Sequence, residues 1–121
     1  MILHIVLYRP KPSATPEELS ELVNALEVAS REIPSIRQVR VGRVVDFGFN
    51  YSNRSKDQKD INVAVFEFDD LNALKAYLAH EAHKRLASLF WSTCDQPTII
   101  DVSAVDPTVQ GISTVFGQIA D

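Results

Sequence analysis

The stretch INVAVFEF, residues 61–68, decides the fold. Its odd and even positions are both mostly apolar, and an extended chain sends these two sets to opposite faces of a sheet. A strand that is apolar on both sides has to be covered on both sides, which is typical of the middle of a sheet. Residues 1–9 have the same character and are stopped by Pro10 and Pro12. We therefore expect two central strands.

An amphipathic helix is expected after each central strand. Thr15 is placed to cap the first helix, and Glu18 can close a capping box with it. Apolar residues then recur at helical spacing, with charged residues on the other side. Asp69 or Asp70 can cap the second helix, where leucines recur at spacings of three and four. A further helical stretch is expected over residues 81–91.

Two outer strands and a loop complete the pattern. Apolar residues fill nearly all odd positions of 39–49, which is typical of a long, half-exposed strand. The polar segment 50–60 is expected to be a flexible hairpin loop. Pro97 opens the last strand, expected over residues 98–105.

This order of elements, βαββαβ, predicts an α+β, ferredoxin-like sandwich: a four-stranded antiparallel sheet with helices on one face. Both central strands are also apolar on the other face, so a single chain would expose a large apolar surface. We therefore expect a homodimer that packs face to face and encloses a small apolar pocket. Residues 1–106 form one expected domain. The tail, residues 107–121, is expected to be an interface arm or an added strand, with a loose terminus as the alternative.

Composition excludes several classes of function. The net charge of -4 repels phosphate backbones, so nucleic acid is not an expected partner. No leader or membrane-spanning segment is recognisable, so no membrane contact and a cytoplasmic location are expected. Cys94 is the only cysteine, which excludes an internal disulfide and a cysteine metal cluster. The four glycines form no phosphate-binding loop.

The three histidines are concentrated around one place. His80 and His83 lie in the sequence YLAHEAH, which begins at Tyr77, and His4 lies inside the first central strand. In a continuous helix Tyr77, His80 and His83 would be about 60° apart from one to the next, so that all three could line one side of a cavity. His4 could face them from the sheet.

A histidine in the first strand, the Tyr-x-x-His-x-x-His pattern and Asp101 in the last strand together resemble the stress-responsive A/B barrel domain family (Dabb), over about residues 2–105. The resemblance implies a dimeric α/β barrel. The chain is also distantly similar to a plant member, olivetolic acid cyclase, in carrying this motif. That similarity implies that Tyr77 and His83 are a catalytic pair for aldol cyclisation of a linear polyketide, and that His4 and His80 support the pocket.

The chemistry of such a pair is simple, because a neutral imidazole can take a proton from an activated carbon and a phenol can hydrogen-bond the resulting oxyanion. No cofactor, metal or nucleotide is needed. The expected function is a cyclase or lyase that acts on a polyketide-like or other small carbonyl compound. Three alternatives stay open: a stress-related dimer that binds a small apolar ligand without turnover, a cofactor-free monooxygenase, and a zinc site formed by the three histidines. His4 and Tyr77 could also simply be core residues.

Overall fold

The computed structural model describes residues 1–53 and 60–108. The elements along the chain are β1 (Ile2–Pro10), α1 (Pro16–Glu32), β2 (Gln38–Arg43), the 3-10 turn η1 (Asn50–Asn53), β3 (Asn62–Phe68), α2 (Leu71–Ala79), α3 (Glu81–Thr93) and β4 (Cys94–Ser103). The expected βαββαβ order is confirmed, with the second helical region divided into α2 and α3. No helix in the described part of the chain is long and apolar enough to cross a membrane.

The four strands form one antiparallel sheet in the order β2-β3-β1-β4. Strands β1 and β3 are therefore central, as their two apolar faces predict. The register pairs His4 with Phe66 on one side and with Asp101 on the other. Residues far apart in the sequence are thus brought side by side at the centre of the sheet.

Local interactions start both long helical regions where the sequence predicts. Thr15 Oγ1 accepts a hydrogen bond of 3.1 Å from the backbone N–H of Glu18 and donates one to the Glu18 carboxylate. Asp70, rather than Asp69, caps α2 by accepting from the backbone N–H of Ala73. These caps set the residue at which α1 and α2 begin.

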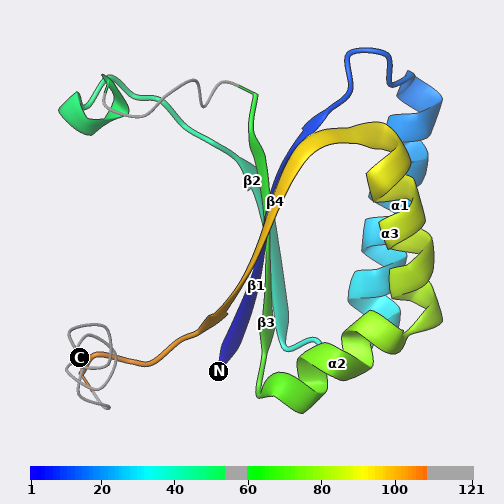
Figure 1. Ribbon diagram of the computed structural model, residues 1–121, viewed down its shortest axis with the longest axis vertical. Helices are drawn as coiled ribbons and strands as arrows, with labels where there is room; N and C mark the ends of the chain where they lie inside the picture. Colours follow the sequence, from blue (N-terminus) through cyan, green and yellow to red (C-terminus); the bar gives the residue numbers. More distant parts are fainter. Residues whose placement is uncertain (54–59, 109–121) are drawn as a thin grey trace.

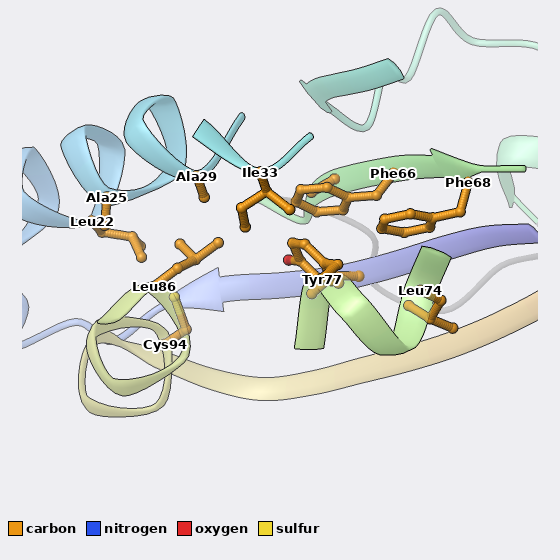
Figure 2. Close-up of a cluster of buried hydrophobic side chains, with 12 residues drawn as sticks. Leu22, Ala25, Ala29, Ile33, Phe66, Phe68, Leu74, Tyr77, Leu86 and Cys94 are labelled. Atoms are coloured by element: carbon orange, nitrogen blue, oxygen red, sulfur yellow. The ribbon is translucent and has the colours of Figure 1, made fainter. Parts of the chain in front are cut away.

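The helices cover only one face of the sheet (Figure 1). On that face the core contains Phe66 and Phe68 of β3, with Ala25 and Ala29 of α1 and Leu74 of α2 packed over them (Figure 2). Strand alternation sends a second apolar set to the opposite face. This set, called the uncovered face below, contains Leu3, Ile5, Leu7, Val63, Val65, Ile100 and Val102.

Strand β2 is shorter than predicted, and the expectation of a strand over residues 39–49 is wrong beyond Arg43. An alternating pattern forms a strand only where a neighbour can pair with it, and the partner β3 begins at Asn62, opposite Arg43. One more hydrogen bond joins Val44 N–H to the Ile61 carbonyl, and Asp60 then adopts a left-handed φ of 65°. Residues 44–49 therefore leave the sheet.

The other boundaries differ less. Strand β4 begins at Cys94, earlier than the predicted residue 98, because Arg9 and Pro10 continue to pair with it beyond a β-bulge. In the segment 50–60, residues 50–53 form η1, and residues 54–59, on which the expected hairpin loop mainly rests, lie outside the described residues. The predicted interface arm or strand of the tail also lies outside them from residue 109 onward.

Candidate functional site

A cavity of about 320 Å³ lies between the covered face of the sheet and the helices. Most of its wall is apolar, with Val6 from β1, Leu22 and Leu26 from α1, and Leu86 and Phe90 from α3. Alternate residues of β1 contribute to it because they point to the same side of the strand. The cavity is therefore built by the same covered face that forms the core.

At one end of this cavity two histidines, a tyrosine and an aspartate gather, and they come from four elements. They are His4 of β1, Tyr77 of α2, His83 of α3 and Asp101 of β4. The structure thus brings together three of the four residues expected from the sequence, and the fourth, His80, lies elsewhere.

His4 is buried and is held by Asp101 on the neighbouring strand. Its Nδ1 lies 2.6 Å from Asp101 Oδ1, and the two residues are directly paired between β1 and β4. An ionised carboxylate only accepts, so His4 Nδ1 is the donor. This contact fixes the orientation of the imidazole ring, and its Nε2 is left for other partners.

The Tyr77 ring contacts both imidazoles. Its centroid is 5.7 Å from that of His4 and 4.5 Å from that of His83. The ring centroids of Phe66 and Phe68 are each 5.2 Å from that of Tyr77, and Figure 2 shows the three rings packed together. Tyr77 is only 2% exposed, and burial raises the pKa of its phenol well above the usual 10, so the hydroxyl stays protonated.

The Tyr77 hydroxyl has no hydrogen-bond partner among the described residues. Among the described residues only Ser35 Oγ is a fully buried polar side-chain atom without a partner, so the Tyr77 hydroxyl keeps access to the space of the cavity. This hydroxyl belongs to a residue that lines the cavity. It is therefore available to a molecule bound there.

His83 is oriented by the backbone. Its Nδ1 lies 3.1 Å from the carbonyl oxygen of Leu78, which can only accept, so Nδ1 is the donor and Nε2 is the basic nitrogen. Burial lowers the pKa of His83 below its usual 6.5, the hydrogen bond to Leu78 works against this, and the nearby His4 lowers it further. At neutral pH the imidazole is thus uncharged and can accept a proton.

His80 does not line the cavity, so the expectation that it supports the pocket is not met. The helix is interrupted at this residue, whose φ and ψ of -73° and 142° are extended. His80 instead caps α3, with its Nδ1 accepting from the backbone N–H of Ala82 at 3.0 Å. Tyr77, His80 and His83 do not follow one another in steps of 60°, because the helix is not continuous through His80. Within the described residues no group of three or more metal-ligating side chains comes together, so the zinc alternative has no geometric support.

Sequence reasoning missed the aromatic end of the cavity. Tyr8, Phe90 and Trp91 line it, with edge-to-face contacts of 5.5 Å between Tyr8 and Phe90 and of 5.3 Å between Phe90 and Trp91. Burial raises the pKa of Tyr8, and Cys94 adds to this. The signal was present in the period of β1, because His4 and Tyr8 are four residues apart and share a face. Along a strand this separation is about 13 Å.

Comparison with known proteins agrees with this architecture. A family model described as the stress responsive A/B barrel domain, Dabb, matches residues 2–104. A search of curated proteins gives no match. Among solved structures, the Arabidopsis thaliana protein At3g17210 has a TM-score of 0.69 at 22% identity, covering 88% of this chain and 97% of its own.

Two further structures have the same fold. A dimeric ferredoxin-like protein of unknown function from Thermobifida fusca has a TM-score of 0.65 at 19% identity, with coverage of 85% and 90%. The hydroxynitrile lyase from Passiflora edulis has a TM-score of 0.70 at 11% identity, with coverage of 88% and 96%. At these identities the likeness concerns the fold.

Proposed function

Because the chain belongs to the stress responsive A/B barrel domain family, we propose that it works as a homodimeric barrel enzyme, a cofactor-free cyclase or lyase for a small apolar carbonyl compound. One observation carries this proposal. Tyr77 is buried as a residue, its hydroxyl donates to no other described residue, and its ring packs against the uncharged imidazole of His83. A hydrogen-bond donor and a base are thus placed together in an apolar cavity.

The proposed chemistry is a proton transfer followed by carbon–carbon bond formation. His83 Nε2 takes the proton from a carbon next to a carbonyl group, and the electron pair of that C–H bond moves into the enolate. Tyr77, kept protonated by its raised pKa, donates a hydrogen bond to the enolate oxygen. In a cyclase the enolate carbon attacks a second carbonyl of the same molecule, and the proton on His83 passes to the new alkoxide.

A lyase runs the same sequence in reverse. His83 takes the hydroxyl proton, the carbon–carbon bond breaks, and the proton returns to the carbanion that leaves. The Passiflora edulis relative is a hydroxynitrile lyase, which indicates that this fold accommodates such chemistry. Fold alone does not decide function, so this supports the reaction class and no particular substrate.

His4 and Asp101 support the pair from the sheet. The His4 ring meets the Tyr77 ring edge-on at 5.7 Å, and Asp101 holds the His4 ring by its Nδ1. We assign Asp101 the role of a positioning residue, which acts on the site through His4. The apolar wall favours a substrate that carries its polar groups at one end only.

The apolar side chains of the uncovered face support the proposal of a homodimer. A sheet face with seven apolar side chains and no helix over it is the kind of surface that soluble proteins bury against a partner. The Thermobifida fusca relative is described as dimeric. Two sheets packed in this way would give the barrel.

The test is turnover by matched variants. Linear β-polyketones and α-hydroxynitriles are offered to the protein, and ring closure, carbonyl release and oxygen uptake are recorded. We expect Tyr77→Phe and His83→Gln each to lower kcat by about a hundredfold or more, since a general base or an oxyanion donor contributes this much. The control is His80→Asn, which lies outside the cavity and retains a cap.

The other outcomes separate the alternatives. Wild-type turnover in both variants would exclude the proposed pair. Oxygen uptake with a phenolic substrate would identify a monooxygenase instead. Ligands that raise the melting temperature without giving any product would indicate a binding protein.

A further inference from the structure

Residues 44–53, called the arm below, expose a cluster of aromatic side chains. Phe47, Phe49 and Tyr51 are 66%, 52% and 56% exposed, and Val45 is 75% exposed. Their rings nevertheless contact one another, with centroids 5.9 Å apart for Phe47 and Phe49 and 5.1 Å for Phe49 and Tyr51. Clustered, solvent-exposed aromatic rings are typical of interaction surfaces.

The backbone holds this cluster in place. Asp46 accepts a hydrogen bond of 3.0 Å from the backbone N–H of Gly48, and Gly48 has a left-handed φ of 82°. The turn lies between Phe47 and Phe49 and brings their rings into the stacked contact. An arm that is ordered before binding loses less conformational entropy on binding.

A second exposed apolar patch lies at the cavity itself. Trp91 of α3, Ile99 of β4 and Val23 of α1 all line the cavity and are 56%, 43% and 54% exposed. We call these three residues the rim. A cavity for an apolar substrate that opens between such residues is incompletely closed in a single chain.

The arm and Ile99 of the rim lie at opposite edges of the sheet, whereas Trp91 and Val23 belong to the helices over its covered face. The arm continues β2, the rim includes β4, and these are the two outer strands. Figure 1 shows that the arm extends to the side of the sheet away from the helices, which is the side of the uncovered face. The arm therefore borders the space that a second copy would fill.

We propose that the arm of each copy packs on the rim of the other, so that each cavity is closed by residues of both chains. This inference rests on the homodimer proposed above. It requires a two-fold axis parallel to the strands, because this rotation places β2 of one copy beside β4 of its partner. The two strands then run antiparallel, as neighbours in this sheet do.

The level of the two patches fits this arrangement. Through the register, Arg43, which directly precedes the arm, is level with Asn62 and Tyr8, two pairs beyond Val6 and Ile99. Stacked sheets are about 10 Å apart, and the six residues from 44 to 49 can span up to about 20 Å. The arm is therefore long enough to reach β4 of the partner, the strand that carries Ile99 of the rim.

The other possible two-fold axis, perpendicular to the strands, would place the apolar arm against charged residues. An axis perpendicular to the strands would place the arm beside the beginning of the partner's β2. Arg37 there forms exposed ion pairs with Asp69 at 2.8 Å and with Glu67 at 3.7 Å. Aromatic rings over this charged cluster would remove it from water, at a cost in free energy. The apolar rim matches the arm better.

The only tryptophan of the chain, Trp91, reports on the contact directly. Acrylamide quenching of its fluorescence is compared in the wild type, in the double variant Phe47→Ala/Phe49→Ala, and in the control Leu71→Ala, an exposed residue of α2. We expect the arm variant alone to raise the quenching constant at least about twofold, because Trp91 loses the rings that exclude water from it. Unchanged quenching in an arm variant that is still dimeric would overturn the proposal.

Sedimentation of the same samples separates the two proposals. A wild type that is monomeric contradicts the homodimer itself, whereas a dimer with unchanged quenching contradicts only the arm contact. A second measurement uses oxidative cross-linking of mixed chains. Phe49→Cys is expected to cross-link with Ile99→Cys and not with Arg37→Cys, and the opposite result would overturn the proposed axis. Retention of the wild type, but not of the arm variant, on phosphatidylcholine vesicles without any cross-link would assign the arm to a lipid surface and would also overturn it.

Discussion

At the scale of single residues, the site depends on two hydrogen bonds that set which nitrogen is free. The carbonyl oxygen of Leu78 accepts a hydrogen bond from Nδ1–H of His83, and the carboxylate of Asp101 accepts one from Nδ1–H of His4. In both rings Nδ1 carries the hydrogen of this bond, and Nε2 is the nitrogen that remains for other partners. The two imidazoles thus owe their orientation to Leu78 and Asp101, which also line the cavity.

The lowered pKa of His83 gives a prediction on pH. Its folded-state pKa lies below the unfolded value of about 6.5, so the stability linked to this group is complete above about pH 6.5 and is lost as the pH falls through the folded pKa. Activity should persist below pH 6.5 for the same reason, because the imidazole stays uncharged there. The measurement is an NMR titration of the His83 ring together with the pH profile of kcat. A His83 midpoint at or above 6.5 would contradict this, and His83→Gln should remove the corresponding step from the profile of unfolding.

At the scale of elements, the break between α2 and α3 determines what His80 does. Because His80 is extended, its side chain turns back onto the first turn of α3. We expect His80→Ala to lower the free energy of unfolding by about 1 kcal/mol, as loss of a helix cap does, and His80→Asn to retain most of it. Denaturant unfolding measures both. A loss of kcat in His80→Asn at unchanged stability would instead place His80 in the site.

The sequence predicts those elements whose signals are local. The caps at Thr15 and Asp70 and the double-sided strands β1 and β3 follow from short stretches of residues, and the structure confirms them. The end of β2 at Arg43 does not follow, because it depends on where the partner strand begins.

The site was predictable to a similar degree. His4, Tyr77 and His83 were singled out from the sequence, and they meet at the cavity. The contact of His4 with Asp101 depends on strand register across 97 residues, which no local pattern contains. His80 caps α3 because the helix is interrupted at this residue. The spacing of Tyr77, His80 and His83 in the sequence does not reveal this interruption.

At the scale of the whole molecule, the two faces of the sheet differ. In a single chain one face is packed against the helices and the other is exposed to solvent. The covered face holds the core and the cavity, whereas Ile5 and Val65 point to the uncovered face from adjacent central strands. An apolar face of this kind is stable in water when a second sheet covers it. The proposed dimer therefore follows from the same double-sided strands that decide the fold.

This face provides the last prediction. In the proposed dimer Ile5→Lys places an unpaired ammonium group between two sheets, which costs roughly 3–5 kcal/mol, and each 1.4 kcal/mol is a tenfold change in Kd. We expect the dissociation constant of the dimer to rise at least about a hundredfold, so that light scattering at micromolar concentration reports a monomer. Leu71→Lys, on the exposed start of α2, is the matched control and should remain dimeric. Circular dichroism verifies that both variants are folded, because the lysine at position 5 points away from the core. A folded Ile5→Lys protein that is still a dimer would mean that the two copies meet elsewhere, and the barrel would then have to be abandoned.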